Sequence, residues 1–290
     1  MLARSKLGEL RGKFADAIRR ADMPGDGRMF VVVDRDSIKR ICAHVFREMS
    51  ARYVVGMGAD DRPFSGGFMV GHTFAFDRDR LFCTLLTYLP AGDPSIDSIS
   101  EVVPAANWSE REFRDLVGIV PVGHTYPKRL VLPDGWPDGI HPLRKDVSWD
   151  HLPTEFDGGQ EFKFGDPPDG CVVVPFGPFH PTLDEPAHFR LYVEGEMVRG
   201  CEYRGFMAHR GIEKLAESVL SYNDIPMMAE RICGICGCVH SVAYVQAVEN
   251  AAGLRAPERA EYIRTIMLEI ERLHSHLLWV GLACHIVGFD

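Results

Sequence analysis

The stretch Arg-Ile-Cys-Gly-Ile-Cys-Gly-Cys-Val-His-Ser, residues 231–241, places three thiols and an imidazole within a few positions of one another. Two glycines between the cysteines let the backbone turn tightly, because glycine has no Cβ to restrict it. Residues 239–253 have the pattern of a helix. His240 would then lie one turn beyond Cys236, on the same helix face. The spacing predicts a soft-metal site where this helix starts.

Three other chemistries also use closely spaced cysteines. Structural zinc usually needs two close pairs of ligands, and the sequence has no second pair at finger or ribbon spacing. His274 and His276 cannot form that pair, since residues two apart on a helix point in nearly opposite directions. An iron–sulfur cluster would need a distant fourth cysteine, and a thioredoxin-like dithiol would need a βαβ setting. A metal centre at Cys233 and Cys236 is the leading interpretation.

The composition limits the classes of function. A net charge of −9 over 290 residues argues against nucleic-acid binding, which needs a basic face. The best candidate for a membrane span, residues 277–289, is too short and contains His285. The basic residues 1–20 predict a docked amphipathic helix and not a targeting sequence. Eight scattered cysteines fit a reducing cytoplasm.

The pattern along the chain predicts an α+β fold. Residues 1–150 are expected to form a small α/β domain with a mostly antiparallel sheet. Residues 151–170, rich in proline and glycine, form a linker. Residues 171–290 begin with a small β-sheet and continue as a helical bundle. The predicted helices are 36–50, 105–116, 239–253 and 256–287, and the predicted strands are 53–57, 67–76, 81–89, 171–175, 188–193 and 197–203.

A second cluster, His-Arg-Gly-Ile-Glu-Lys at residues 209–214, contains Glu213 close to a helix start. A glutamate in that position ordinarily stabilises the helix dipole at the surface. A carboxyl that moves protons beside a metal would instead need a pKa adjusted by burial. From the residues alone both interpretations stay open.

These motifs together resemble a known family. Arg-x-Cys-Gly-x-Cys-x-x-x-His at residues 231–240, preceded by Arg-Gly-x-Glu at 210–213, resembles the N-terminal signature of nickel–iron hydrogenase large subunits. The surrounding sequence is similar to the membrane-associated, energy-converting branch, and most of all to the formate hydrogenlyase type. That similarity is carried by VPFGPFH (174–180), DEPAHFRLYVEGE (184–196) and LEIERLHSHLLWVGLACHIVGFD (268–290).

The first half of the chain has its own resemblance. WSEREFRDLVGI at residues 108–119 and HPLRKD at 141–146 are similar to the small peripheral-arm subunit of respiratory complex I. Large subunits of the formate hydrogenlyase type are fusions of these same two modules, as are the fused C/D-type subunits of NADH-quinone oxidoreductase. The resemblance therefore covers nearly the whole chain.

The resemblance implies a role for each matching residue. Cys233 corresponds to a terminal nickel ligand and Cys236 to a thiolate that bridges nickel and iron, the iron carrying carbon monoxide and cyanide. His240 would hydrogen-bond the bridging thiolate, and Glu213 would pass protons. Arg231 belongs to the same motif and is expected to be catalytic. Soft thiolates suit nickel and low-spin iron, in agreement with this assignment.

One departure from the family pattern is large. The family completes its centre with a second CxxC near the C-terminus of a much longer large subunit, and this sequence has none. We therefore expect these residues to be a fragment or truncated product that is inactive alone. Cys238 occupies a usually non-ligating position and is treated as incidental.

The predicted function is that of the N-terminal part of a hydrogenase large subunit, which would catalyse H2 ⇌ 2H+ + 2e−. The resemblance implies electron transfer to 4Fe–4S clusters in an iron–sulfur small subunit. It also implies membrane subunits and a formate dehydrogenase module as partners. The chain is expected on the cytoplasmic side, peripheral to the inner face of the cell membrane and without an anchor of its own.

Two alternatives remain. The first is a complex I-like NAD(P)H/quinone oxidoreductase subunit, in which the same fold lines a quinone cavity. His180 in Phe-Gly-Pro-Phe-His-Pro would then bind the quinone, although that branch has lost the cysteines found here at 233 and 236. The second alternative is a scaffold that keeps docking surfaces and does no chemistry.

Overall fold

The computed structural model describes residues 2–25, 27–151, 153, 164–180, 183, 185–207 and 209–289. The chain divides into two compact units, one of Met1–Phe179 with Glu185–His209 and the other of His180–Asp184 with Arg210–Asp290. The mixture of sheets and helices confirms the predicted α+β class. Much of the predicted linker at 151–170 lies outside the described residues, so the predicted domain boundary stays a prediction.

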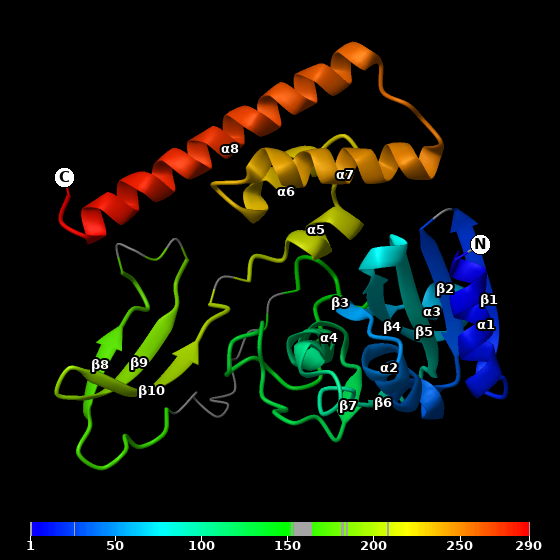
Figure 1. The fold of residues 1–290 in the computed structure, drawn as a ribbon, viewed down its shortest axis with the longest axis horizontal. Coiled ribbons are helices and arrows are strands. Elements are labelled where there is room, and N and C mark those ends of the chain that lie inside the picture. Colours follow the sequence, from blue (N-terminus) through cyan, green and yellow to red (C-terminus); the bar gives the residue numbers. More distant parts are fainter. Residues whose placement is uncertain are drawn as a thin grey trace. The chain divides into compact units, whose positions relative to one another are not determined.

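The first unit contains a five-stranded sheet with the strand order β1-β2-β5-β4-β3 (Figure 1). The β2–β5 pair is parallel, and the other three pairs are antiparallel. The prediction of a mostly antiparallel sheet is therefore confirmed. The strands are β1 (Ile18–Gly25), β2 (Arg28–Val33), β3 (Arg52–Asp60), β4 (Gly67–Phe76) and β5 (Leu81–Pro90).

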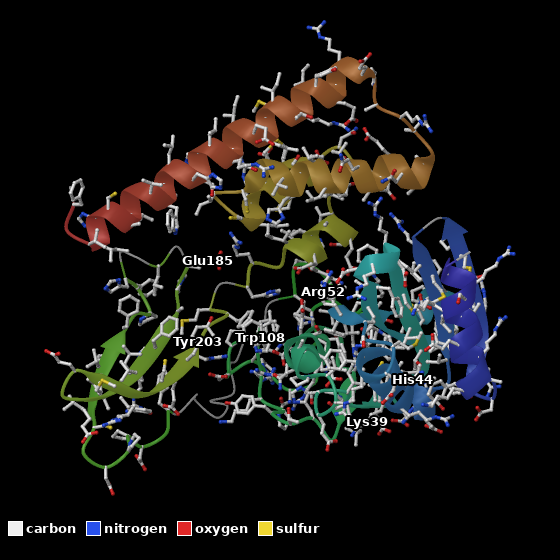
Figure 2. All side chains as sticks on the ribbon, viewed as in Figure 1. Lys39, His44, Arg52, Trp108, Glu185 and Tyr203 are labelled. Carbon is white, nitrogen blue, oxygen red and sulfur yellow. The ribbon has the colours of Figure 1, made fainter. Side chains whose placement is uncertain are left out.

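Helix α2 (Ile38–Arg47) forms because its apolar residues recur at helical spacing. Its buried side chains are Ile38, Ile41, Cys42 and Val45, which is one stripe of a helix. On its outward side, Lys39 forms an ion pair with Glu101 at 2.8 Å (Figure 2). A helix at 36–50 was predicted, and its last three residues lie outside the observed helix.

Helix α4 (Asn107–Val117) approaches strand β3 very closely, which requires glycine in the strand. A Cβ added at Gly58 would lie 2.5 Å from the Cβ of Phe113, and one at Gly56 would lie 2.8 Å from the Cβ of Ser109. The Gly56 amide also donates to Ser109 Oγ at 3.2 Å. The predicted helix at 105–116 is thus confirmed and held against the sheet.

The N-terminus differs from the sequence prediction. Helix α1 covers only Leu2–Phe14, and the chain then enters strand β1 at Ile18. The helix is amphipathic as expected, since Leu7, Leu10 and Phe14 are buried. Neither β1 nor β2 is among the predicted strands. Strand β1, with the sequence IRRADMPG, lacks apolar alternation and takes its shape from pairing with β2. Strand β2, with the sequence RMFVVV, does carry strand-forming residues and was overlooked.

The three-stranded sheet in the first unit has the order β10-β9-β8, and both pairs are antiparallel. It confirms the predicted strands, and a hairpin turn at residues 195–196 joins β9 to β10. Gly195 has a φ of +60° in that turn, a conformation that glycine adopts without steric cost. The strands are β8 (Val172–Phe176), β9 (His188–Glu194) and β10 (Met197–Arg204); short elements elsewhere in the unit are α3 (Arg62–Ser65), β6 (Ser95–Asp97) and β7 (Val120–Val122).

The second unit is helical. Helix α7 ends at Gly253, whose φ of +67° gives a left-handed C-terminal cap, and Pro257 is the N-cap of α8. None of the helices in the described part of the chain is long and apolar enough to cross a membrane. The helices are α5 (Ile212–Ser218), α6 (Ile225–Ala229), the 3-10 turn η4 (Glu230–Ile232), α7 (Gly237–Ala252) and α8 (Glu258–Ile286).

The long helix α8 confirms the prediction for 256–287, but its apolar stripe is not covered. Ile266 is 56% exposed, Leu273 62% and Leu277 71%. A 29-residue helix with such a stripe normally stabilises itself by packing that face against other helices. The predicted helices are therefore present, but among the described residues no buried bundle core covers the apolar stripe of α8.

Candidate metal centre

The two predicted thiolate ligands lie in the loop between η4 and α7. Cys233 ends the 3-10 turn in an extended conformation, and Cys236 is the N-cap residue of α7. Neither glycine of the motif has a positive φ, so the turn does not depend on left-handed backbone. The space at Gly237 is tight, because a Cβ there would lie 3.0 Å from the carbonyl oxygen of Glu230.

The loop wraps around the sulfur of Cys233. The amides of Ile235 and Cys236 both point their N–H at Cys233 Sγ, each at 3.4 Å. The Cys233 thiol also hydrogen-bonds Cys236 and raises the pKa of that thiol, with burial adding to the shift. The two sulfurs therefore face each other across a tight turn, with amide donors available to a thiolate at Cys233.

His240 lies beside the second cysteine, one turn further along α7. Its Nε2 is 3.5 Å from Cys236 Sγ. This contact follows from the i, i+4 spacing on one helix face, which the sequence predicted. The geometry allows the imidazole to donate a hydrogen bond to a thiolate at Cys236. Its catalytic role stays a prediction.

Arg210 connects the two sequence motifs. Its Nη2 donates a hydrogen bond to the carbonyl oxygen of Ile232 at 2.9 Å. Ile232 is the residue directly before Cys233. A charged donor on a main-chain carbonyl is stronger than a neutral one and fixes the backbone at that point. Sequence reasoning gave Arg210 no role of its own, although its position in Arg-Gly-x-Glu marked it.

The other two residues predicted to be catalytic lie at the surface of the described chain. Glu213 is exposed in the first turn of α5, and within the described part of the chain its side chain forms no hydrogen bond or ion pair. Arg231 is exposed and forms an ion pair with its neighbour Glu230 at 3.0 Å. The burial expected around a carboxyl that moves protons is thus not supplied by the described residues, and both roles stay predictions.

Glu271 of α8 reaches the start of α7, and sequence reasoning missed it. Its Oε1 accepts the amide of Cys238 at 2.5 Å and its Oε2 that of Val239 at 3.0 Å. The pKa of the Cys238 thiol is raised, first by burial and then by the charges of Glu271 and Glu230. No signal in the sequence marks Glu271, because its partners lie more than thirty residues away on another helix.

His180, the residue predicted to bind a quinone, belongs to the second compact unit. It is half-buried in the loop after β8, and its carbonyl oxygen accepts the amide of Leu183 at 2.9 Å. The prediction of quinone binding at His180 remains untested.

The donor set fits a soft metal in part. Two facing sulfurs, a nearby imidazole and inward-pointing amides are suitable surroundings for thiolate-bound nickel. Among the residues that the structure describes, no three His, Cys, Asp or Glu side chains converge on one point. Any metal held by Cys233 and Cys236 would therefore need further ligands besides these two thiolates.

Two protein-family models match the chain. Residues 31–152 match the 30 kDa subunit of respiratory-chain NADH dehydrogenase, and residues 210–282 match the nickel-dependent hydrogenases. The site described above lies wholly in the second match. The chain thus combines a module of the NADH dehydrogenase class with a module of the nickel-dependent hydrogenase class.

More specifically, the chain is homologous to hydrogenase subunits of the formate hydrogenlyase type. It is 42% identical to formate hydrogenlyase subunit 5 of Escherichia coli (strain K12), over 91% of this chain and 47% of that protein. It is 39% identical to hydrogenase-4 component G of the same organism, over 98% of this chain and 52% of that one.

The complex I branch is also represented among the relatives. The fused C/D-type protein of NADH-quinone oxidoreductase from Edwardsiella ictaluri (strain 93-146) is 30% identical over 97% of this chain and 51% of the relative. The chain spans about half the length of the curated relatives it matches. These findings confirm the resemblance drawn from the motifs, including the fusion of the two modules.

Proposed function

We propose that this chain is the N-terminal part of the catalytic large subunit of a nickel–iron hydrogenase of the formate hydrogenlyase type. The proposed reaction is H2 ⇌ 2H+ + 2e−. The observation that carries it is the cluster of Cys233, Cys236 and His240 at the start of α7. A quinone site has no need of two facing thiols, whereas a thiolate-bound nickel site does.

The protein's own residues would act on the metal and on the proton. Cys233 and Cys236 would hold a nickel–iron centre, which supplies the soft Lewis acid needed for heterolytic cleavage of dihydrogen. His240 Nε2 would donate to the Cys236 thiolate and fix its orientation. Arg210 would fix the backbone before Cys233 through the carbonyl oxygen of Ile232.

Glu213 is proposed as the acceptor that takes the proton away. Glu213 lies in the first turn of α5, which begins directly after Arg210 and Gly211. Arg210, which fixes the loop before Cys233, is therefore close to Glu213 in the sequence. A proton acceptor needs access both to the site and to solvent. The exposed carboxylate meets the second requirement, and the first is part of the proposal.

The electrons are proposed to leave through an iron–sulfur partner that holds 4Fe–4S clusters. The two hydrogenase relatives are named as a subunit and a component, which fits a chain that works inside a complex. Membrane subunits and a formate dehydrogenase module are the further partners proposed. A position on the cytoplasmic side, peripheral to the cell membrane, completes the proposal.

A second candidate function is that of a complex I-like quinone or NAD(P)H oxidoreductase subunit. It is favoured by the match of residues 31–152 and by the C/D-type relative. The residue that would serve it is His180. The thiols at Cys233 and Cys236 are the observation against it, since they have no role in binding a quinone.

The experiment uses the complex purified from cells that also express its maturation proteins. Hydrogen–deuteron exchange, measured by mass spectrometry of the gas phase, reports dihydrogen cleavage without any electron acceptor. We expect exchange in the native complex and its loss in Cys236→Ser. Quinone reduction without any hydrogen–deuteron exchange would support the second candidate. Absence of both activities would support a scaffold.

A further inference from the structure

Helix α7 begins without a cap of its own. Cys236 is its N-cap residue, and the Cys236 side chain makes no capping hydrogen bond. The first turn also contains no acidic residue. The first amides of a helix have no partner within the helix, so a start of this kind normally frays or recruits a group from elsewhere.

Glu271 of α8 supplies the missing cap from another helix. Its two carboxylate oxygens accept the amides of Cys238 and Val239 at 2.5 and 3.0 Å. These are the second and third residues of α7, whose amides an N-cap side chain would ordinarily take. A carboxylate at this end of a helix is also favoured by the helix dipole.

Because Glu271 accepts the first amides of α7, the side chain of the N-cap residue Cys236 is not needed as their hydrogen-bond acceptor. With the amides already taken, the Cys236 sulfur turns toward Cys233 and lies 3.5 Å from His240 Nε2. Serine or aspartate in that position would bond its own helix start. The fold thus separates the capping group, on α8, from the sulfur that faces the proposed metal.

Both oxygens of Glu271 are engaged by main-chain amides, so the carboxylate acts through the backbone. A second polar contact joins the same two helices near the other end of α7. There Arg264 of α8 binds both carboxylate oxygens of Glu249, at 2.6 and 2.9 Å. Removing Glu271 therefore frees the first turn of α7 while α7 and α8 stay connected.

We propose that Glu271 is a positioning residue for the thiolate site, holding the first turn of α7 so that Cys236 and His240 keep their spacing. This inference rests on the proposed function for its metal and on the two hydrogen bonds for its geometry. The variants are Glu271→Ala, which removes the cap, and Glu271→Gln, which keeps one accepting oxygen. Glu249→Ala is the matched control, because it breaks the other contact between the same helices.

The first measurement is hydrogen–deuterium exchange of the peptide covering residues 236–243 in the purified complex. Loss of a helix cap should speed its exchange by about fivefold in Glu271→Ala, since a cap contributes about 1 kcal/mol. We expect a smaller change in Glu271→Gln and none in Glu249→Ala. Unchanged exchange in Glu271→Ala would overturn the proposal, and so would an equal increase in Glu249→Ala.

The second measurement is the nickel content and the number of sulfur ligands, from elemental analysis and nickel X-ray absorption. We expect Glu271→Ala to lose most of its nickel or to show fewer sulfur neighbours, and Glu249→Ala to keep both values. Native nickel coordination in Glu271→Ala would overturn the positioning role. If the native complex itself holds no nickel, the proposed function fails, and the exchange measurement alone then decides whether Glu271 caps the helix.

Discussion

Arg210 Nη2 lies 2.9 Å from the carbonyl oxygen of Ile232, and this hydrogen bond joins the two motifs that define the site. The guanidinium stands at one end of the segment 210–213, and the carbonyl directly precedes Cys233. This hydrogen bond explains in physical terms how the motif at 210–213 is connected to the motif at 231–240. The hydrogen bond connects the residues before α5 to the loop that carries the cysteines, and it does so without a metal.

Replacing Arg210 by alanine should disturb the Cys233 loop. The carbonyl of Ile232 would lose a charge-assisted donor, and because this contact is exposed to solvent the cost should be about 0.5–1 kcal/mol of local stability. We expect lower nickel content in the purified complex and faster hydrogen exchange over residues 230–236. Arg255→Ala is the control, because Arg255 lies exposed in the loop before α8. Equal nickel contents in Arg210→Ala and the native complex would contradict this role.

His240→Ala removes the donor beside Cys236 and leaves both thiols in place. Loss of a group that orients a metal ligand typically costs 10–100-fold in activity or affinity, and we expect about that loss of hydrogen–deuteron exchange. Nickel should remain detectable by elemental analysis. His274→Ala, on the exposed surface of α8, should behave as the native complex. Full activity in His240→Ala would separate the imidazole from the chemistry.

Glu213→Gln tests the proposed proton acceptor. The amide keeps the size of the side chain but cannot take up a proton, so hydrogen–deuteron exchange should fall by at least about tenfold, a typical general-base contribution being larger. Nickel content should not change. Glu217→Gln on the same helix removes a carboxylate that forms an ion pair with Lys214 and serves as the control. Unaltered exchange in Glu213→Gln would remove Glu213 from the proton route.

The first unit has a pH dependence that is independent of any metal. Burial raises the pKa of Glu110 to about 7, although Ser98 Oγ and the Ile99 amide donate to its carboxylate at 2.5 and 2.7 Å. The folded state therefore holds a proton that the unfolded state releases above its ordinary pKa of 4.5. The contribution of Glu110 to stability is complete below that value and is lost as the pH rises toward about 7.

Glu110→Gln should remove this dependence. Each unit of pKa shift corresponds to about 1.4 kcal/mol, so the native chain should lose roughly 3 kcal/mol of unfolding free energy over this range relative to the variant. Urea unfolding between about pH 5 and pH 8 measures the difference. Parallel pH profiles for the two chains would show that Glu110 is ionised in the folded state throughout.

Local patterns in the sequence predicted most elements of the fold. Strand β4 has the predicted limits 67–76, and α8 forms where the helical stripe lies. Both have a local apolar pattern of their own, because β4 is a nearly continuous apolar run and the apolar residues of α8 recur at helical spacing. Strand β1 has none, since its residues are extended by pairing with β2, and that pairing could not be read from its composition.

In the site, too, local contacts were predicted from the sequence and contacts between distant elements were not. The contact between Cys236 and His240 lies within one helix turn, and the spacing alone predicted it. The contacts of Arg210 with Ile232 and of Glu271 with Cys238 cross between elements 22 and 33 residues apart. Such contacts depend on how helices pack, which no local pattern encodes.

The most direct test of the central claim is the nickel content of the purified complex, compared among Cys233→Ser, Cys236→Ser and Cys238→Ser. Cys238 belongs to the same motif but lies in the first turn of α7, with its amide bound to Glu271. The account predicts about one nickel per large subunit in the native complex and in Cys238→Ser, and loss of nickel in the other two variants. Equal nickel in all four proteins, or none in the native complex, would contradict it.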